Sequence, residues 1–244
     1  MKKTLLAVTS FLFFILFYSN VFSQVPADFE ALFNGEDLTG WVLKGKPEDT
    51  VKNYWSVDDE AIIVNSIGDK DHDYVWLVSM GEFDNFELQI KFAVYKSSPG
   101  NSGIQLRSRY DDEAFWMDGP QIDIAPAEPW RTGFIWDETR GESRWIYPDL
   151  PAEQEVDESM QKKSVPLIYS DDEEKWNQLE VYADGNKIQA WLNGDKITDF
   201  KAKKILDNEV HRDHDVGKKG HICLQLHTGD ELMMKYKDIF IKEL

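Results

Sequence analysis

Hydrophobic and polar residues alternate along most of this 244-residue chain. The alternation is clearest from Phe86 to Tyr95, where nearly every second residue is a large apolar one. Because successive side chains of a β-strand point to opposite faces, this period of two predicts a long, half-buried strand. The same pattern predicts shorter strands at residues 54–57, 61–65, 74–79, 176–183, 187–193 and 232–242.

Turn sequences separate the predicted strands. Asp184-Gly185-Asn186 lies between two of them, and Asn193-Gly194-Asp195 follows the second. Gly and Asn tolerate the positive φ angles of tight hairpin turns, so we expect a hairpin at residues 184–186. No long segment has the period of an α-helix. Short strands joined by regular turns predict an all-β fold, either a sandwich or a jelly roll.

Three further strands are predicted at Asn101–Arg107, Gly119–Ile124 and Gly220–His227. One side of them is apolar and is expected to face the core: Ile104, Leu106, Ile122, Ile124, Ile222, Leu224 and Leu226. The other side carries Gln105, Arg107, Gln121, Asp123, Gln225 and His227. A single such strand is typical of an ordinary solvated sheet face. Together the three are poor in Lys and Glu and rich in groups that hydrogen-bond hydroxyls, which predicts a carbohydrate site.

Residues 140–170 interrupt the strand pattern. They contain Pro148, Pro151 and Pro166 among many charged residues. A long irregular segment within a domain is usually functional or disordered, and we expect this one to pack beside the mouth of the site. Four tryptophans lie in or next to irregular segments: Trp116, Trp130, Trp136 and Trp145. We expect at least one of them, with Trp136 as the candidate, to stack on a sugar ring.

The first 23 residues have the features of a secretory signal peptide. Lys2 and Lys3 precede an apolar run that is too short for a convincing membrane span, and Val21-Phe22-Ser23 resembles a cleavage site. We therefore expect an exported protein, periplasmic or secreted, with no membrane span after cleavage. Residues 24–244 contain no linker or low-complexity segment, and we expect them to form one domain.

Composition excludes some partners and some chemistry. The formal charge is −18 at pH 7, and nucleic-acid binding requires basic patches that replace counterions, so no nucleic acid is expected as a partner. The single cysteine, Cys223, excludes an intrachain disulfide. It alternates with apolar neighbours in a predicted strand, and we expect it to pack there rather than to act as a nucleophile.

Seven short motifs together resemble the 3-keto-disaccharide hydrolase family, and they occur in that family's order. They are Leu32–Trp41, Asn101–Ile104 with Arg107, Gly119–Asp123, Gly133–Glu138 with Arg140, Trp176-Asn177, Leu192–Gly194 and Gly220–His227. The resemblance covers nearly all of the chain after the signal peptide. It implies an exported carbohydrate-active protein whose fold is a concanavalin A-like jelly-roll sandwich, with two antiparallel sheets and one concave polar face.

Ordinary retaining glycoside hydrolysis is disfavoured by the sequence. Residues 121–124 resemble the strand that carries alternating catalytic carboxylates in laminarinase-type glycosidases. In this chain the first of those positions is Gln121, an amide that cannot act as a carboxylate nucleophile. Retaining hydrolysis needs two carboxyl groups roughly 5 Å apart. If the protein is an enzyme, it must therefore cleave the glycosidic bond by another route.

The family resemblance implies such a route for 3-keto glucosides and 3-keto-disaccharides. A ketone at C3 acidifies the C2 proton, a base removes it, the enolate expels the group on C1, and water then adds. The implied base is His227, with Asp123 and Glu138 as acids or orienting groups and Arg107 stabilising the enolate. The expected sugar-binding residues are Asn101, Gln105, Gln121, Arg140, Gln225 and Trp136.

Metal binding and oligomeric state are left open by the sequence. If a divalent ion takes part, the expected ligands are Asp123, Glu138 and His227. The spacing His211-Arg212-Asp213-His214 also fits a pair of ligands, but no third ligand is identified, and we expect a charged surface loop there.

Two other functions also fit the sequence. A non-catalytic carbohydrate-binding module needs only the same polar face, and a structural or partner-binding domain of the cell envelope needs only the fold and the acidic loop. Retained glycan binding without turnover would favour the first, and absence of sugar affinity the second.

Overall fold

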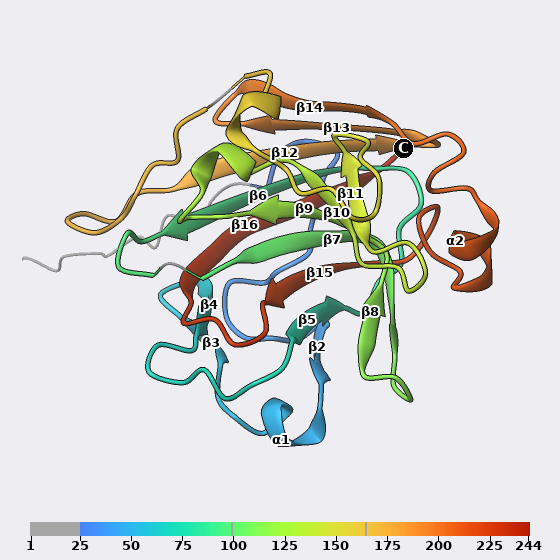
Figure 1. Ribbon diagram of the computed structural model, residues 1–244. Helices are drawn as coiled ribbons and strands as arrows, with labels where there is room; N and C mark the ends of the chain where they lie inside the picture. The colour runs from blue at the N-terminus through green and yellow to red at the C-terminus, as the bar shows by residue number, and fades with distance from the viewer. Residues whose placement is uncertain (1–24, 99, 164) are drawn as a thin grey trace, which may run out of the picture.

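Two antiparallel β-sheets pack face to face in the computed structural model, which describes residues 25–98, 100–163 and 165–244 (Figure 1). The back sheet has the order β14-β13-β12-β6-β16-β4-β3, with β1 paired to β16. Its strands are β1 (Glu30–Ala31), β3 (Trp55–Asp58), β4 (Ala61–Asn65), β6 (Phe86–Val94), β12 (Asn177–Asp184), β13 (Lys187–Leu192), β14 (Asp195–Lys201) and β16 (Met233–Glu243). The predicted signal peptide lies outside the described residues.

The front sheet has the order β11-β10-β9-β7-β15-β5-β2, with β8 paired to β7. Its strands are β2 (Trp41–Gly45), β5 (Val75–Ser79), β7 (Ser102–Asp111), β8 (Trp116–Asp118), β9 (Pro120–Ile124), β10 (Ile135–Asp137), β11 (Arg144–Tyr147) and β15 (His221–Leu226). The helices are short: α1 (Pro47–Thr50), α2 (Glu209–Asp213) and the 3-10 turns η1 (Pro129–Arg131) and η2 (Glu158–Met160). This arrangement confirms the predicted all-β jelly roll.

The core lies between the two sheets. The alternating apolar residues of β6 meet those of the front sheet in one continuous cluster, which includes Leu88, Ile90, Ile104, Ile122 and Leu224, each at most 1% exposed. Burying one such side chain stabilises the fold by roughly 2 kcal/mol. The inward faces predicted from the alternation for β6, β7, β9 and β15 are therefore confirmed.

Tight turns form where the sequence predicts them. Asp184 pairs with Lys187, so Gly185 and Asn186 make a two-residue hairpin loop between β12 and β13. Gly185 has φ +54°, a conformation that is easy for glycine. The next turn, at Asn193 and Gly194, also has positive φ at both residues and leads into β14. The register of the back sheet follows from this turn chemistry.

The outer side of the front sheet is not an open, solvated face. Gln105, Gln121 and Gln225 point away from the core, yet each is at most 2% exposed. Cys223 lies on the same side in a small apolar cluster with Trp76, Val78 and Met117. Cys223 is buried, which agrees with its predicted packing role. Loops and the β7–β8 hairpin therefore cover this side and enclose part of it.

Residues 140–170 contribute to that cover. They contain β11 and η2, and Gln161 donates a hydrogen bond to the Trp130 carbonyl at 2.9 Å. The Tyr169 hydroxyl donates to the Pro126 carbonyl at 2.6 Å. The segment thus packs against β10 and the loop after β9. Among the residues described, no helix is long and apolar enough to cross a membrane.

Candidate functional site

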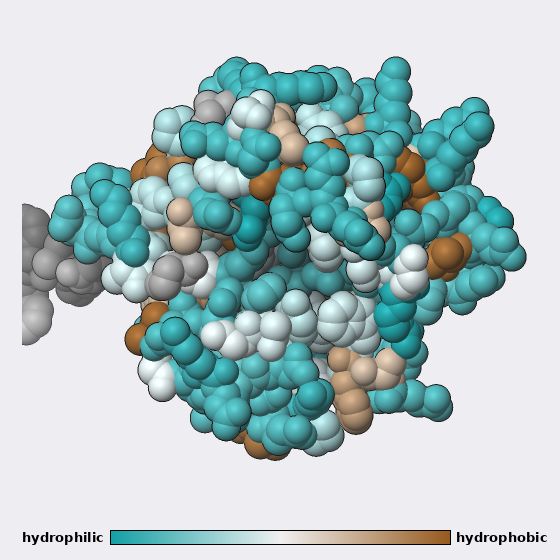
Figure 2. Space-filling view, in the orientation of Figure 1, coloured by the Kyte–Doolittle hydropathy of each residue, from teal (hydrophilic) through white to brown (hydrophobic). Residues whose placement is uncertain are grey.

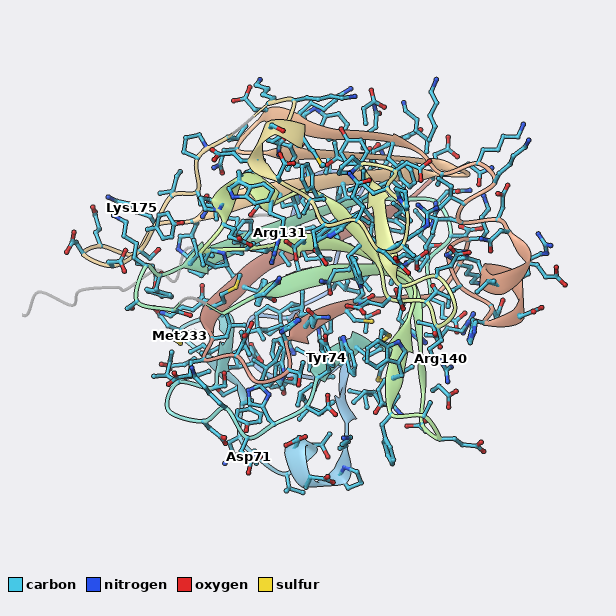
Figure 3. All side chains as sticks on the ribbon, viewed as in Figure 1. Asp71, Tyr74, Arg131, Arg140, Lys175 and Met233 are labelled. Atoms are coloured by element: carbon cyan, nitrogen blue, oxygen red, sulfur yellow. The ribbon has the colours of Figure 1, made fainter. Side chains whose placement is uncertain are left out.

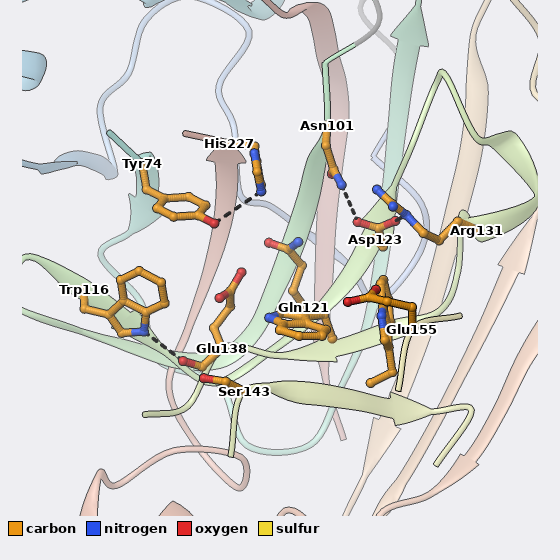
Figure 4. A pocket seen from close by; sticks show the side chains of 12 residues that line it. Tyr74, Asn101, Trp116, Gln121, Asp123, Arg131, Glu138, Ser143, Glu155 and His227 are labelled. Carbon is orange, nitrogen blue, oxygen red and sulfur yellow. Dashed lines mark hydrogen bonds and ion pairs between the residues drawn. The ribbon is translucent and has the colours of Figure 1, made fainter. Parts of the chain in front are cut away.

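A cavity of about 280 Å³ opens on the outer side of the front sheet (Figure 4). The space-filling view shows a hollow in this face among mostly hydrophilic residues (Figure 2). Twelve residues line the cavity: Tyr74, Asn101, Trp116, Gln121, Asp123, Arg131, Trp136, Glu138, Ser143, Trp145, Glu155 and His227. They come from β8, β9, β10, β11, the turn η1 and the loops that precede or follow the strands, so only the folded sheet brings them together.

His227 follows the last residue of β15 and is held at both ring nitrogens. Its Nδ1 lies 3.3 Å from the Asp230 carboxylate and 3.2 Å from the Thr228 carbonyl, and both of these are acceptors. Nδ1 therefore carries a hydrogen, and in the neutral ring Nε2 carries the lone pair. Nε2 lies 3.2 Å from the Tyr74 hydroxyl, which donates to it (Figure 4). The reactive nitrogen thus points into the cavity.

The pKa of His227 is set by opposing effects. Burial lowers this pKa, while the hydrogen bond to Asp230 and the negative charges of Asp230 and Glu138 raise it further than burial lowers it. Asp230 is itself fixed, because its Oδ2 accepts a hydrogen bond from the Asn101 backbone N–H at 2.8 Å. The imidazole is therefore oriented by a carboxylate that has little freedom to move.

Glu138 follows β10 and is 4% exposed. Its Oε1 accepts a hydrogen bond from Gln225 Nε2 at 3.1 Å, and its backbone carbonyl accepts one from the Trp116 indole at 2.8 Å. Burial raises the pKa of Glu138 to about 7, although the hydrogen bonds from Gln225 and Trp136 lower it. A carboxyl group with this pKa exists in both protonation states near neutral pH, as acid–base catalysis requires.

Asp123 and Arg131 form a buried ion pair in the wall of the cavity. Arg131 Nε lies 2.7 Å from Asp123 Oδ2, and Asn101 Nδ2 donates to Asp123 Oδ1 at 3.0 Å. Burial lowers the pKa of Arg131, but the charge of Asp123 raises it overall. The guanidinium also lies 5.7 Å from the centre of the Trp145 ring. A fixed positive charge is therefore available beside the cavity.

Aromatic rings form the remaining walls. Tyr74 stacks on Trp76 at 5.3 Å and meets Trp116 edge-on at the same distance. On the other side, Trp136 and Trp145 pack edge-to-face at 5.2 Å. Flat apolar rings around polar groups suit a sugar, which has apolar C–H faces and a hydroxylated rim.

The structure brings six of the ten predicted site residues to the cavity wall: His227, Asp123, Glu138, Asn101, Gln121 and Trp136. Gln105 and Gln225 lie behind the wall. Gln225 donates to Glu138, and Gln105 Nε2 donates to Gln121 Oε1 at 3.3 Å. These two amides orient residues of the wall, so they differ from the predicted direct contacts with sugar.

Arg107 does not face the cavity, which corrects its predicted role. Gln105 pairs with Cys223 and Ser108 with His221, so β7 has one residue more than β15 in this interval. Arg107 has φ +52° in this bulge, which reverses the direction of its side chain. Its guanidinium donates to the carbonyls of Asp84 at 2.5 Å, Gly185 at 2.9 Å and Gly217 at 3.3 Å.

Arg140 is also placed away from the cavity. It donates to Asp118 and Asp111 and lies to the right of Tyr74 and Arg131 in Figure 3. The Arg140 backbone N–H and Nε donate to Asp118 Oδ1 at 2.9 and 3.1 Å. The predicted sugar contact is therefore replaced by an ion-pair network with the β7–β8 hairpin.

Several cavity residues were not among the predicted site residues. Tyr74 immediately precedes β5, Arg131 is the last residue of η1, and Ser143 and Glu155 belong to the irregular 140–170 segment. Asp230 follows His227 by three residues, and this spacing was the one local signal of an orienting carboxylate. The others have no such signal because they are brought to the cavity by loops.

Asp123, Glu138 and His227 do not fit a divalent-metal site. Both oxygens of Asp123 are already bound, one by the Arg131 cation, and a guanidinium beside the site opposes a second positive charge. Within residues 25–98, 100–163 and 165–244, no group of three or more His, Cys, Asp or Glu side chains has a metal-binding arrangement.

Solved structures of other proteins share this fold. A "putative glycosyl hydrolase" from Parabacteroides distasonis is 21% identical, with a TM-score of 0.56 over 89% of this chain and 94% of the other. The carbohydrate-binding module CBM66 from Bacillus subtilis is 13% identical, with a TM-score of 0.55 over 84% and 96%. At these identities the likeness establishes the fold alone. No curated protein matches the chain in a sequence comparison.

A family comparison matches residues 28–242 to the 3-keto-alpha-glucoside-1,2-lyase-like domain. The match covers nearly all of the described residues, including every residue that lines the cavity. It agrees with the resemblance found in the seven sequence motifs. The chain therefore belongs to the family of 3-keto-alpha-glucoside-1,2-lyase-like domains, which is a carbohydrate-related family.

Proposed function

We propose that this protein cleaves the glycosidic bond of 3-keto glucosides or 3-keto-disaccharides by elimination and subsequent addition of water. The observation that carries the proposal is a cavity in which an oriented imidazole, His227, and a carboxyl group with a pKa of about 7, Glu138, line the same space. Family membership supports the substrate class. Aromatic walls around these polar groups support a sugar as the ligand.

The elimination needs two proton transfers. A base removes the proton on C2, whose acidity comes from the adjacent C3 ketone, and the electron pair forms an enolate. The enolate then re-forms the ketone with a C1–C2 double bond while the C1–O bond breaks, and an acid protonates the leaving oxygen. Addition of water places a hydroxyl on C1 and returns a proton to C2. No oxidant or reductant enters these steps.

His227 is the base in this proposal. Its Nδ1–H is held by Asp230 and Thr228, so Nε2 presents the lone pair toward the cavity. The imidazolium formed after proton removal is stabilised by the Asp230 carboxylate at 3.3 Å. Tyr74, which donates to Nε2 at 3.2 Å, occupies the position that a C–H donor takes in the complex. The substrate displaces this hydrogen bond when it binds.

Glu138 is the acid. It must carry its proton when the C1–O bond breaks, and a pKa of about 7 leaves a large protonated fraction at neutral pH. Gln225 holds one oxygen, Oε1, by a hydrogen bond at 3.1 Å. The carboxyl group therefore has a fixed orientation relative to the cavity.

Arg131 takes the role that was predicted for Arg107. Its positive charge lies in the cavity wall and stabilises negative charge as it develops on the enolate oxygen. Asp123 and Glu128 hold the guanidinium through Nε and NH1, both at 2.7 Å. Asn101 and Gln121 present amide groups that bind hydroxyls of the sugar ring.

Turnover of a 3-keto glucoside in heavy water tests the route. The product should carry deuterium at C2, and NMR or mass spectrometry detects it. Because ketone α-protons also exchange slowly without an enzyme, the same sugar in buffer alone and with the His227→Ala variant gives the background. We expect His227→Ala to lower kcat by about a thousandfold. Cleavage without label above background would exclude the elimination route.

A non-catalytic carbohydrate-binding function is the second candidate. The observation in its favour is that Tyr74, Trp116, Trp136 and Trp145 surround the cavity, which suffices to hold a sugar without any proton transfer. This function predicts saturable glycan binding that survives His227→Ala, with no turnover of any 3-keto sugar. Calorimetry with wild type and variant, alongside the turnover assay, separates the two functions.

We also propose that the protein is exported, because residues 1–23 have the composition of a signal peptide. Sequencing the N-terminus of the protein recovered from the periplasm or culture medium tests this. A mature chain that begins near Gln24 is the expected result. Recovery of full-length chain from the cytoplasm alone would contradict it.

A further inference from the structure

His211 is a buried histidine that the proposed reaction does not use. The sequence predicted a charged surface loop for His211-Arg212-Asp213-His214, but the structure places His211 in α2 with an exposed fraction of 0%. Asn208 caps this helix, and its Oδ1 accepts the His211 backbone N–H at 3.0 Å. The prediction is therefore wrong for His211, whose ring points inward.

Both ring nitrogens of His211 face hydrogen-bond acceptors. Nδ1 lies 2.8 Å from Asn208 Oδ1, and Nε2 lies 2.8 Å from Asp137 Oδ2. The Asn208 amide cannot be reversed, because its Nδ2 donates to Glu142 Oε1 while its Oδ1 accepts the backbone N–H. Nδ1 must therefore carry a hydrogen.

The bond to Asp137 then requires one more proton. A neutral ring with hydrogen on Nδ1 would point its Nε2 lone pair at a carboxylate oxygen 2.8 Å away, in a site where both side chains are fully buried. Two acceptors at this distance repel each other, and burial removes the water that would separate them. A proton between Nε2 and Oδ2 makes the contact a charge-assisted hydrogen bond.

This pair lies directly behind the proposed acid. Asp137 is the last residue of β10 and precedes Glu138, and its Oδ1 accepts the Thr139 backbone N–H at 3.1 Å. The Glu138 backbone N–H donates to the Gly119 carbonyl at 3.0 Å. Hydrogen bonds thus fix the backbone at Glu138 and at Thr139, which follows it. The bond at Thr139 is made by the Asp137 carboxylate, and His211 holds that carboxylate.

The segment that follows α2 presses against the imidazole. A Cβ on Gly217 would lie 3.3 Å from His211 Cδ2 and 2.7 Å from the Leu206 carbonyl oxygen, so only glycine fits there. Gly217 is also bonded to Arg107, through its N–H to the Arg107 carbonyl at 3.0 Å and its carbonyl to the guanidinium at 3.3 Å. The buried Arg107 therefore closes the pocket that contains His211.

We propose that His211 is a positioning residue, which binds Asp137 as an imidazolium–carboxylate pair and so fixes the orientation and charge environment of Glu138. The link to turnover depends on the proposed function, but the paired state and its effect on Glu138 do not. The charged and titratable groups that face this assembly are few. Glu142 contacts it through Asn208, Arg107 through Gly217, and His227 acts on Glu138 from across the cavity.

The protonation of His211 is tested directly in the wild-type protein. In ¹⁵N NMR, both ring nitrogens of His211 should show the shifts of a protonated imidazolium at neutral pH, with a slowly exchanging Nε2 proton. The His211→Gln spectrum assigns the signals. Shifts of a neutral ring with one unprotonated nitrogen would overturn the proposal.

The effect on Glu138 is tested with two opposed substitutions. His211→Gln keeps a donor for Asp137 but removes the positive charge, and should move the titration of Glu138 to higher pH. Asp137→Asn keeps a hydrogen bond to a neutral imidazole and so removes both charges of the pair; because the Asp137 charge is the one of the two that acts more strongly on Glu138, the titration should move to lower pH. Carboxyl ¹³C NMR follows Glu138 in both variants without a substrate, and Glu138→Gln assigns the signal.

Opposite shifts distinguish a specific charge effect from general loosening of the fold, which would move both variants in the same direction. His214→Gln is the matched control, because His214 lies in the same segment but contacts Asp118 and Arg140. It should leave the Glu138 titration unchanged. Equal shifts in both variants, or no shift in either, would overturn the proposal.

The turnover arm uses the same variants. If the proposed function holds, His211→Gln should lower kcat for a 3-keto glucoside by about tenfold with little change in KM, because small misplacement of an acid is costly. A wild-type protein that turns over no keto sugar would refute the proposed function while leaving the two NMR results to decide the role of His211.

Discussion

Two arginines, Arg107 in β7 and Arg131 in η1, have contrasting surroundings. Arg131 binds the carboxylates of Asp123 and Glu128 beside the cavity, with 21% of its side chain exposed. Arg107 is 1% exposed and donates mainly to backbone carbonyls, those of Asp84, Gly185 and Gly217. Arg107 lies in one of the strands predicted to carry the site and Arg131 follows another, yet only Arg131 lines the cavity.

The difference lies in what satisfies the guanidinium. The guanidinium of Arg107 donates to backbone carbonyls of three separate segments and thereby links them. Burial lowers the pKa of Arg107 to about 10. Carboxylates instead raise the pKa of Arg131 against the effect of its burial. A buried arginine among carbonyls is therefore structural, whereas one held by carboxylates beside a cavity keeps a charge available to a ligand.

The largest expected effect is at Arg107, the buried arginine. Arg107→Lys keeps the charge but has no planar fork, so it leaves carbonyls of Asp84, Gly185 or Gly217 without a donor. We expect a loss of about 4 kcal/mol in the free energy of unfolding, measured by urea denaturation. Activity per folded molecule should be retained. A stable variant without activity would reverse the assignment of the two arginines.

The pH dependence of stability sharpens the comparison next. Because the pKa of Glu138 is raised from 4.5 to about 7 in the folded protein, its contribution to stability is full below pH 4.5 and is lost as pH rises through about 7. The free energy of unfolding of wild type relative to Glu138→Gln should fall by about 3 kcal/mol over that range. Arg107 does not titrate in this range, so it contributes nothing to the change of stability with pH.

Chemical denaturation of both proteins at several pH values measures this difference, and subtraction removes the contributions of the other carboxyl groups. A constant difference across the range would show that Glu138 titrates normally. It would then lack the property that supports its role as the acid.

The smallest expected effect is at Arg131, which lines the cavity. Arg131→Lys keeps a cation beside Asp123 but loses the planar fork that Asp123 and Glu128 hold. We expect kcat/KM for a 3-keto glucoside to fall about tenfold, with the free energy of unfolding within about 1 kcal/mol of wild type. Steady-state kinetics and urea denaturation on one preparation provide both values. Unchanged kinetics would remove Arg131 from the site.

Most of the longer strands were predictable because each of them carries its own signal. The period of two in Phe86–Val94 and the turn residues Gly185 and Asn193 are local properties, and they define β6, β12 and β13 nearly to the residue. The sequence did not predict β1, β2, β8, β10, β11 or β14, most of which are too short for a sustained alternation. Their neighbours in the sheet stabilise them instead.

The candidate site was predictable only in part. His227, Asp123 and Glu138 were found because the first two lie at outward positions of regular strands and the third lies in a family motif. Arg107 was misplaced because parity fails at a bulge, where Gly220 allows close approach: a Cβ there would lie 2.6 Å from the Arg107 carbonyl carbon. The residues around Arg107 do not predict this bulge, because it depends on a glycine more than a hundred positions away in the sequence.

The sequence by itself indicated the family through seven motifs, and it determined most of the longer strands and which of their faces is apolar and therefore buried. Local alternation and turn chemistry suffice for that, since they act between residues a few positions apart. Only the tertiary structure decided that Arg131 rather than Arg107 borders the cavity, and that His211 is buried against Asp137. These outcomes depend on strand register and loop packing between distant segments, and no local pattern encodes them.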